Sequence, residues 1–442
     1  MIADESLTER ITPEKTSNGD DRNDYQHDRD IILYSSALQR LSGITQVVSA
    51  GTGHVFHNRL THTLQVAQVG RRLAEKLKIK QKDLANALGG LDPDAIEAAC
   101  LAHDLGHPPF GHVAEETLNR IAGSEVEGFE GNAQSFRIVA ELAFRSPDHN
   151  GLNLTRATLK GILKYPWTYP HRPLGKEKKW GAYTSELPAY KHATGVADGR
   201  AVQRWVGAEL MDWADDLTYS VHDVEDFYRA GLIPLHALRP DSKGLPSSSE
   251  RQRFLNYVAG RREKIPELAN VKDDELDSIL RELIFAFVPI DRPYEGTREQ
   301  RARLRKFTSN LVGRYINGLR LHEPEDSKTV SINEEFKTEI ALLKQLTWCY
   351  VIDAPFLAIQ QHAQRQIIRY LFNAFRHEVK RRPTNLLPPY YRDRLSQIPE
   401  GDIQERRVVV DLIAGMTEAQ ATAVYQRMNG IVVAAALDKI LI

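Results

Sequence analysis

Apolar residues recur every three to four positions through most of this chain, which is the spacing that gathers them on one face of an α-helix. The pattern runs through residues 30–41, 59–77, 94–106, 201–227, 276–287, 298–316, 333–348, 357–382 and 417–428. The alternation typical of strands is scarce, and only residues 45–51 and 430–436 are expected to form short strands. The sequence therefore predicts an all-α, predominantly helical fold with small β elements at most.

Polar stretches between these segments indicate how the chain is organised. Residues 1–23 are polar and charged, with little apolar material to bury, and are expected to be a flexible lead-in. The rest, residues 24–442, is expected to form one large helical domain, with a core at about 55–230 and a C-terminal helical region at about 250–442. Segments rich in proline, glycine, serine or charge are expected to be loops at 165–186, 239–252 and 321–331.

Composition narrows the classes of function. The 58 lysines and arginines nearly balance the 59 aspartates and glutamates, which argues against a surface built throughout to bind nucleic acid or anionic membrane. The two cysteines, Cys100 and Cys349, lack CxxC spacing, so neither a disulfide framework nor a thiolate zinc site is expected. Because no apolar run resembles a signal peptide or an uncharged membrane span, we expect a cytoplasmic protein that does not contact membranes.

One short stretch, Cys100–Glu116 (CLAHDLGHPPFGHVAEE), concentrates side chains that carry chemistry. Asp92 and Pro93 have the residue types of an N-cap and a first helical position, and Gly-His-Pro-Pro ends the helical pattern that follows. His103 and Asp104 therefore lie near the end of a strongly apolar helix, where they must find partners or suffer desolvation. A divalent metal would satisfy both, because it needs several donors that converge on it.

Further donors must come from other helices. His62 lies on an earlier predicted helix, and a later one carries the adjacent aspartates Asp215 and Asp216, between which spacing alone does not choose. Asp215, Tyr219 and Asp223 are four residues apart and so share one helical face. A single helical histidine or an acidic helix face is usually an ordinary solvated feature. It is the combination that favours a metal site.

Five segments carry a family resemblance: HNRLTHTLQVA at 57–67, LAHDLGHPPFGHVAEETLN at 101–119, FEGNAQSFRI at 129–138, LMDWADDLTYSVHDVED at 210–226 and DLIAGMTEAQA at 411–421. In this order they resemble the motifs of HD-domain deoxynucleoside triphosphate triphosphohydrolases, the bacterial deoxyguanosinetriphosphate triphosphohydrolase-like family. The resemblance extends from about Asp28 to Tyr425, which is nearly the whole chain. It implies a helical phosphohydrolase fold, with the HD core at about 55–230, and a metal site formed by His62, His103, Asp104 and Asp215.

The types of ligand define the expected cofactor. Imidazole and carboxylate donors without thiolates suit a divalent ion, with Mg²⁺ or Mn²⁺ expected first and Fe²⁺, Co²⁺, Zn²⁺ or Ni²⁺ also suited. Such an ion polarises a phosphoryl oxygen and lowers the pKa of a bound water, so phosphate-ester hydrolysis is the expected chemistry.

Three other residues of the Cys100–Glu116 stretch have expected catalytic roles. His112 and Glu115 are three residues apart at the start of the next predicted helix, so the carboxylate could orient and charge the imidazole for proton transfer. His107 could donate a hydrogen bond to a phosphate oxygen. The resemblance implies the same use of a His-Glu pair beside the metal.

Substrate contacts are expected at five more residues. Arg59, one helical turn before a predicted metal ligand, would place a guanidinium beside the phosphate, and Lys164 is a second cation that could contact it. Tyr219 and Asp223 would contact the sugar by packing and by a hydrogen bond to its 3′-hydroxyl, and the resemblance adds Gln46 as another sugar contact. The resemblance alone implies the reaction, in which water attacks the α-phosphorus and the products are a deoxynucleoside and inorganic triphosphate.

The expected partners are deoxynucleoside triphosphates, as substrate and also as allosteric activator, and further copies of the chain in a homo-tetramer or homo-hexamer. Arg298, Arg301 and Arg305 lie near one helix face that could bind nucleic acid or an activating nucleotide, although a solvated face is the simpler explanation. Two alternative functions stay open: another HD phosphohydrolase acting on nucleotides, and a nucleotide-sensing or single-strand nucleic-acid-binding regulator. The preferred base is not predicted, although dGTP is the nucleotide of the family name.

Overall fold

The computed structural model describes residues 7–14, 19–46, 58–239, 249–284, 292–324, 326, 328–381 and 385–431. Its α-helices are α1 (Asp24–Tyr34), α2 (Ser36–Arg40), α3 (Arg59–Lys80), α4 (Lys82–Ala87), α5 (Pro93–Ala102), α6 (His112–Ala122), α7 (Gly131–Arg137), α8 (Arg156–Ile162), α9 (Leu187–Thr194), α10 (Val206–Arg229), α11 (Ser249–Ala259), α12 (Asp273–Glu282), α13 (Arg298–Ile316), α14 (Glu334–Thr347), α15 (Pro355–Val379), α16 (Pro389–Ser396), α17 (Glu405–Ala414) and α18 (Glu418–Met428). Two strands, β1 (Leu319–Leu321) and β2 (Val330–Ile332), pair antiparallel.

Several helices begin where a side chain accepts a hydrogen bond from a free backbone N–H group. At α5 the Asp92 side chain accepts a hydrogen bond from the backbone N–H of Asp94 at 2.8 Å, and Pro93 is the first helical residue, as predicted. The predicted helix at 30–41 is instead divided at Ser35, whose backbone is extended and whose hydroxyl accepts from Leu38 N–H. A serine hydroxyl competes with the helix for backbone groups, and apolar spacing does not reveal this break.

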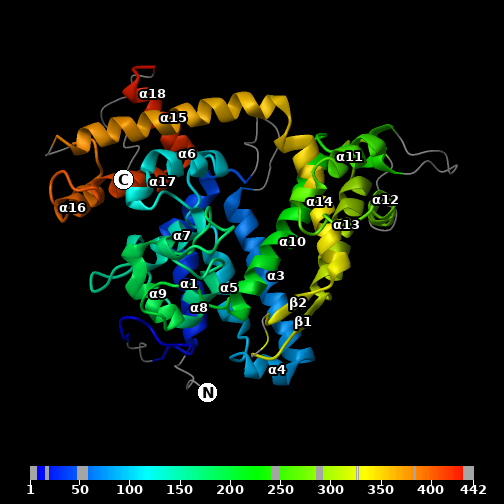
Figure 1. The fold of residues 1–442 in the computed structure, drawn as a ribbon, viewed down its shortest axis with the longest axis horizontal. Helices are drawn as coiled ribbons and strands as arrows, with labels where there is room; N and C mark the ends of the chain where they lie inside the picture. The colour runs from blue at the N-terminus through cyan, green and yellow to red at the C-terminus, as the bar shows by residue number, and fades with distance from the viewer. Residues whose placement is uncertain are drawn as a thin grey trace.

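A first core surrounds α3, α5 and α10. In Figure 1, α10 runs beside α3 and α5, with α13 and α14 on its other side. α1 and α8 pack on α5. The buried side chains of this core include Leu73, Ile96, Leu101, Leu217 and Leu342. These helices therefore hold the end of α5, where His103 and Asp104 follow, inside the molecule.

A second core joins α6 to the C-terminal helices. In Figure 1, α15 lies across the top of the molecule above α6, with α17 and α18 nearby. Leu118 of α6 packs in this core with Phe372 and Phe375 of α15 and Val409 of α17. The C-terminal region is thus packed directly on the helix that begins at His112.

The predicted fold class is confirmed, since the described residues are predominantly helical and their only strands form one short hairpin. That hairpin flanks the segment at 321–331, which was expected to be a loop throughout. Strands of three residues leave almost no alternating pattern to detect. The two expected strands lie mostly outside the described residues, which include only Thr45, Gln46, Gly430 and Ile431 of them.

Part of the expected lead-in lies against the helical body. Arg10 donates a hydrogen bond to Asp28 of α1 at 2.7 Å and another to the carbonyl oxygen of Asn153, also at 2.7 Å. Asp28 is completely buried and also accepts from the Thr155 hydroxyl at 2.6 Å. A buried carboxylate needs such partners, so composition alone understates how residues 7–14 contact the domain. The domain boundaries themselves stay a prediction.

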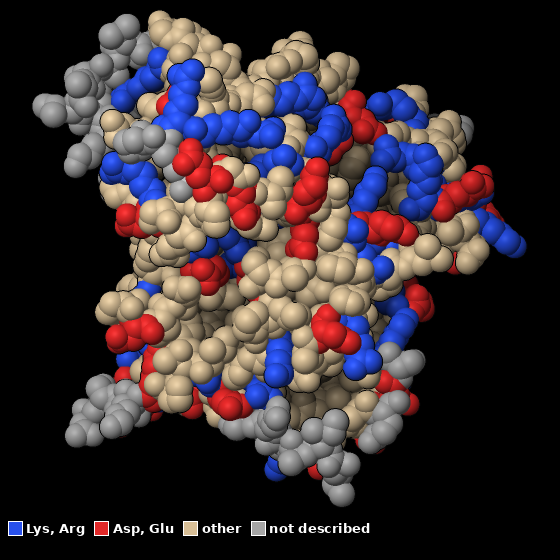
Figure 2. All heavy atoms as spheres, turned by 60° about the vertical axis from the view of Figure 1, so that its left-hand side comes forward, with Lys and Arg blue, Asp and Glu red and all other residues tan. Residues whose placement is uncertain are grey.

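Charged side chains of both signs are scattered over the face seen in Figure 2, and Lys and Arg gather towards its top. Arg298, Arg301 and Arg305 are exposed on α13. None of the described helices is, by itself, both long and apolar enough to cross a membrane. The bent pair Glu334–Ile352 and Leu357–Val379 meets the length and composition requirements only when its two arms are taken together.

A buried ion network ties the C-terminal region to the first half of the chain. The Arg137 guanidinium, at the end of α7, donates to Asp411 of α17 at 2.8 Å and also to Glu186. Gln134 donates to the same Asp411 carboxylate at 3.0 Å. Burial opposes ionisation of Asp411, yet Arg137 outweighs it and holds the pKa of this carboxyl below its ordinary value. Removing one partner of such a network leaves an uncompensated buried charge.

The variant Asp411→Asn should therefore lower the free energy of unfolding by about 3–5 kcal/mol, because the buried guanidinium loses one of its two carboxylates. Urea unfolding at neutral pH measures this difference. Glu299→Gln is the matched control, since Glu299 forms an exposed pair with Arg303 on α13, and it should change stability by no more than about 0.5 kcal/mol.

The difference in unfolding free energy between wild type and Asp411→Asn should also depend on pH. Because the folded pKa of Asp411 is lowered, its contribution is complete above the unfolded pKa of about 3.9 and is lost as the pH falls through the folded value. The gap in stability between wild type and Asp411→Asn should narrow on acidification. A gap that stays constant from neutral to acidic pH would contradict this assignment.

Candidate active site

A cavity of about 390 Å³ opens between the two cores. One wall carries charged and imidazole side chains from α3, α10 and the turn between α5 and α6, and another carries apolar and amide side chains from residues 348–364. The residues that line it include Gln46, Arg59, His103, Asp104, His107, His112, Glu115, Lys164, Lys179, Asp215, Tyr219, Lys344, Trp348, Ile352, Leu357, Gln364 and Glu418.

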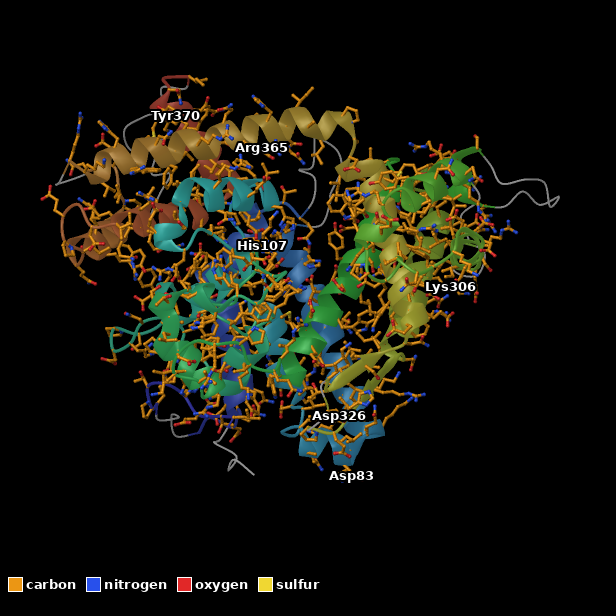
Figure 3. All side chains as sticks on the ribbon, viewed as in Figure 1. Asp83, His107, Lys306, Asp326, Arg365 and Tyr370 are labelled. Carbon is orange, nitrogen blue, oxygen red and sulfur yellow. The ribbon has the colours of Figure 1, made fainter. Side chains whose placement is uncertain are left out.

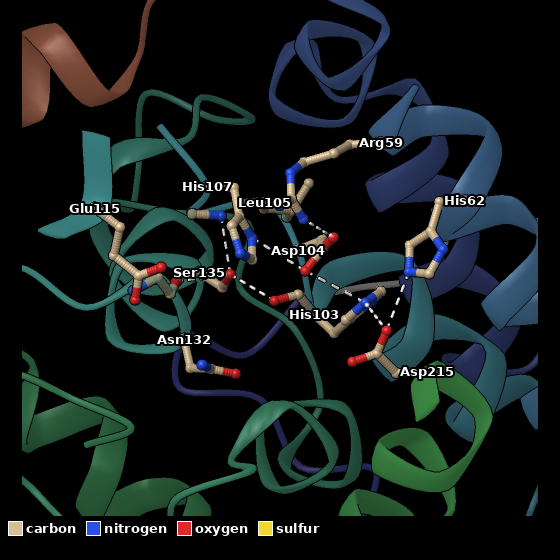
Figure 4. A network of polar contacts seen from close by, with 12 residues as sticks. Arg59, His62, His103, Asp104, Leu105, His107, Glu115, Asn132, Ser135 and Asp215 are labelled. Atoms are coloured by element: carbon tan, nitrogen blue, oxygen red, sulfur yellow. Dashed lines mark hydrogen bonds and ion pairs between the residues drawn. The ribbon is translucent and has the colours of Figure 1, made fainter. Parts of the chain in front are cut away.

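Three side chains from three helical segments converge beside the cavity (Figure 4), and two of them, His103 and Asp215, line it. His62 Nε2 lies 3.0 Å from Asp215 Oδ1, and His103 Nε2 lies 3.7 Å from the same oxygen. One potential ligand atom from each of the three residues lies within 4.8 Å of the other two. The sequence prediction that α3, the end of α5 and α10 meet at one site is in accord with this geometry.

This cluster fits a divalent ion. His103 Nδ1 lies 2.6 Å from the Cys100 carbonyl oxygen, so its N–H can donate there and Nε2 is the ring nitrogen that faces the cluster. His103 Nε2 is buried and has no hydrogen-bond partner. The cluster thus offers two imidazole nitrogens, one of them buried without a hydrogen-bond partner, and a carboxylate oxygen. A divalent ion would bind to such a set of donors.

Asp104 lies beside this cluster but outside it. Its Oδ1 is 3.4 Å from His103 Nε2 and 3.0 Å from His107 Nδ1, while its Oδ2 accepts from the Arg59 guanidinium at 2.6 Å. Asp104 as a fourth ligand therefore stays a prediction. Arg59 and Asp104 are both almost completely buried, and their contact allows the two opposite charges to compensate each other.

The electrostatics of the site follow from burial of these charges together. Burial alone would lower the pKa of His103, but the carboxylates of Asp104 and Asp215 outweigh it and raise the pKa to about 9. Burial opposes ionisation of Asp104, yet His107, His103 and Arg59 hold its pKa well below the ordinary value. The two carboxylates are thus anionic at neutral pH and attract cations.

The structure separates the two adjacent aspartates of α10. Asp215 faces His62 and His103. Asp216 instead forms an ion pair with Lys344 of α14, with 2.7 Å between Oδ1 and Nζ. Neighbouring helical residues point about 100° apart, so only one of them can face the cluster. This supports Asp215, the choice that the family resemblance implied and that spacing left open.

The turn before α6 and the first turn of α6 present a second group of side chains. His112 Nδ1 lies 2.9 Å from Glu115 Oε2, and the rings of His107 and His112 are 5.5 Å apart. Glu115 Oε1 is 3.3 Å from Lys179 Nζ, which also lies 2.9 Å from Glu130. Burial opposes ionisation of Glu115, but His112 and Lys179 outweigh it and lower the pKa of this carboxyl. Glu115 therefore stays an anion beside His112.

Backbone packing fixes this turn relative to α5. A Cβ atom at Gly106 would lie 2.2 Å from the Gly131 carbonyl oxygen, so only glycine allows α7 to approach so closely. The Ser135 hydroxyl, also on α7, accepts from Gly106 N–H at 2.9 Å and donates to the His103 carbonyl at 2.7 Å. These contacts hold the backbone between His103 and His107 in one conformation.

Of the five residues predicted to contact substrate, four line the cavity and one does not. Arg59, Gln46, Lys164 and Tyr219 line the cavity. Lys164 Nζ lies 2.6 Å from Asp212 and 3.5 Å from Asp215. Asp223 lies two turns along α10 from Asp215 and is buried. It is not one of the described residues that line the cavity. Burial and the neighbouring Asp226 hold its pKa well above the ordinary value.

Sequence reasoning missed several residues of the cavity. Lys179 comes from the segment at 165–186 that was identified only as a loop, and Lys344 lies on a helix assigned no function. Trp348 follows that helix. Glu418 belongs to the last of the five motifs, and its presence there was the one signal that could have singled it out.

Comparisons with known proteins identify the family. Residues 59–199 match the HD domain, and residues 330–427 match the phosphohydrolase-associated domain. A deoxyguanosinetriphosphate triphosphohydrolase-like protein of Streptomyces coelicolor is 36% identical over 92% of this chain and 93% of its own length. Proteins of the same name are 36% identical in Corynebacterium efficiens, over 94% of this chain and 93% of the relative, and 31% identical in Shewanella loihica, over 95% of each. This chain is an HD-domain phosphohydrolase and belongs to the deoxyguanosinetriphosphate triphosphohydrolase-like family.

Proposed function

We propose that this protein hydrolyses deoxynucleoside triphosphates to a deoxynucleoside and inorganic triphosphate with the help of a divalent metal ion. One observation carries the proposal: His103 and Asp215 of the metal-binding cluster line the same cavity as the His112–Glu115 pair. A metal site and a proton-transfer pair that face one cavity are the parts that phosphate-ester hydrolysis needs.

His62, His103 and Asp215 would hold the ion, with Asp104 completing the set. When bound, the ion supplies a Lewis acid and a water of lowered pKa. Mg²⁺ or Mn²⁺ is the first choice for carboxylate-rich sites, and Fe²⁺, Co²⁺, Zn²⁺ or Ni²⁺ also suit the two imidazoles. Arg59 lies against Asp104, where its guanidinium can contact a phosphate oxygen.

The His112–Glu115 pair would move a proton. Glu115 orients the imidazole through Nδ1 at 2.9 Å and stabilises its protonated form, since the carboxylate stays ionised. The exposed His112 ring can then give a proton to the leaving 5′-oxygen. His107, held against Asp104, would donate to a phosphate oxygen.

The two walls of the cavity suit the two ends of such a substrate. A triphosphate carries about four negative charges, which match four cations that line the cavity, Arg59, Lys164, Lys179 and Lys344. The apolar wall offers Trp348, Ile352 and Leu357 with glutamine amides, which suits a nucleobase with its flat faces and hydrogen-bonding edge. Between them, Tyr219 and Gln46 would contact the sugar, and a ring packed at C2′ disfavours a ribose hydroxyl.

Partners and location extend the same proposal. Deoxynucleoside triphosphates would act as substrate and also as activator, the chain would assemble as a homo-tetramer or homo-hexamer, and the protein would work in the cytoplasm. Guanine belongs to the names of the relatives, and dGTP is one of four substrates to compare. Nucleic-acid binding by the exposed arginines of α13 is the alternative that a salt-dependent DNA-binding assay distinguishes.

Purified protein loaded with Mn²⁺ should convert a deoxynucleoside triphosphate, alone or in the presence of a second one, to the deoxynucleoside and inorganic triphosphate. Ion-exchange separation of the phosphate products identifies the bond that is broken. Pyrophosphate or orthophosphate as the product would favour another HD phosphohydrolase. No product with any of the divalent ions would favour the nucleotide sensor.

Replacing His103 or Asp215 by alanine should weaken Mn²⁺ binding by about 100-fold or more and abolish turnover, with the fold retained. Isothermal titration with Mn²⁺ and circular dichroism measure the two effects. Asp83→Asn is the control, because Asp83 is exposed on α4, far from His107 in Figure 3. Normal turnover by either alanine variant would contradict the assignment of His103 and Asp215 as metal ligands.

Glu115→Gln should lower kcat by about 10²- to 10⁴-fold and leave Mn²⁺ affinity unchanged, because it removes the charge that supports His112 but no metal ligand. Steady-state kinetics under saturating Mn²⁺ provide the measurement. The neighbouring Glu116→Gln is matched in chemistry, since Glu116 is exposed and pairs with Arg120, and it should retain wild-type kcat. A fall in Mn²⁺ affinity with Glu115→Gln would place Glu115 among the ligands instead.

A further inference from the structure

Glu418, the first residue of α18, reaches from the C-terminal region into the wall of the cavity. Its Oε1 accepts from the backbone N–H of Thr45 at 3.0 Å and from that of Phe110 at 3.2 Å. Its Oε2 accepts from the Thr45 hydroxyl at 2.8 Å. One carboxylate thus receives three hydrogen bonds from two segments that are far apart in the sequence.

Both of these segments lead directly to residues of the site. Phe110 is a non-glycine residue with φ of 69°, and Gly111 follows with φ of 56°. A bulky residue in this region is strained and persists only where surrounding contacts hold it. Phe110, the strained residue, and Gly111 lead directly to His112, the first residue of α6, while Thr45 precedes Gln46.

We propose that Glu418 is a positioning residue, through which the C-terminal helices set the placement of His112 and Gln46 in the cavity. The inference rests on the proposed function for what these two residues do there. Glu418 touches backbone groups and one hydroxyl, and it acts on the reaction through the residues that follow them in the chain.

Glu418 is the acceptor in all three contacts. Two of its partners are backbone N–H groups, which only donate, and the third is a hydroxyl, which can also accept. A glutamine could therefore keep all three contacts, with its oxygen at the two N–H groups and its NH₂ donating to the Thr45 hydroxyl, whereas alanine removes them and leaves both N–H groups without this acceptor.

Other contacts already attach the C-terminal helices, so Glu418 is not needed for that purpose. The Arg40 guanidinium donates to the carbonyl oxygens of Ala414 and Met416 at 3.0 and 3.1 Å. It also donates to those of Leu105 and His107 at 2.7 and 2.8 Å. With this bridge intact, loss of the Glu418 carboxylate should alter the local geometry of the turn while α18 stays in place.

The test compares Glu418→Ala with wild type and with Glu116→Ala, the same change at an exposed glutamate near the site. Hydrogen exchange followed by mass spectrometry should become faster in peptides that contain Thr45 and Phe110 and stay unchanged in α3. With Mn²⁺ loaded, kcat should fall about tenfold to 100-fold, and by the same factor for all four deoxynucleoside triphosphates, because displacement of a reacting group by about 1 Å has effects of this size. Mn²⁺ affinity should match wild type, and the midpoint of thermal unfolding should fall by only about 2–4 °C, the effect of losing a few local hydrogen bonds.

Three results would overturn the inference. Unchanged exchange at Thr45 and Phe110 with unchanged kcat would mean that the carboxylate positions nothing. A change in preference among the four nucleotides would make Glu418 a direct substrate contact. Parallel losses of Mn²⁺ affinity and thermal stability would make it a structural residue. If wild type hydrolyses no deoxynucleoside triphosphate, the proposed function fails, and the exchange measurement still decides whether Glu418 holds the two segments.

Discussion

Burial of several ionised groups in one place is the constraint on which the rest of this structure depends. Asp104 and Asp215 lie among apolar helices, and each would be costly there without partners. Their partners, His62 and Arg59 of α3 and His103 at the end of α5, come from different helices. The apolar packing of α3 on α5 and of α10 on both is what keeps these charges within contact distance.

The C-terminal region completes this arrangement. Its helices cover α6 with apolar side chains, and buried polar contacts join it to the first half of the chain. The Arg137–Asp411 pair and the Arg40 guanidinium both cross between the two regions. Charged groups buried at such a junction tolerate little displacement, because any shift leaves a charge without its partner. The matched HD domain alone therefore describes only part of the environment of His112.

Local signals in the sequence were sufficient for elements whose cause is local. The cap at Asp92, the proline at Pro93 and the His103–Asp104 doublet at the end of α5 could all be identified from neighbouring residues. Spacing could not choose Asp215 over Asp216, because the rotation of α10 is set by packing against distant helices. Lys179 gave no signal, since a lysine in a polar loop looks solvated until the fold brings it to Glu115 and Glu130.

The cations that line the cavity are each paired with a carboxylate of the protein. Arg59 lies against Asp104, Lys164 against Asp212 and Lys344 against Asp216, so each positive charge has a carboxylate within reach. Such pairing allows the charges to be buried at low cost. It also means that a phosphate must compete with those carboxylates for every contact. A ligand with one phosphate can replace few of these pairs, whereas a triphosphate meets several cations at once, so the arrangement favours the more highly charged substrate.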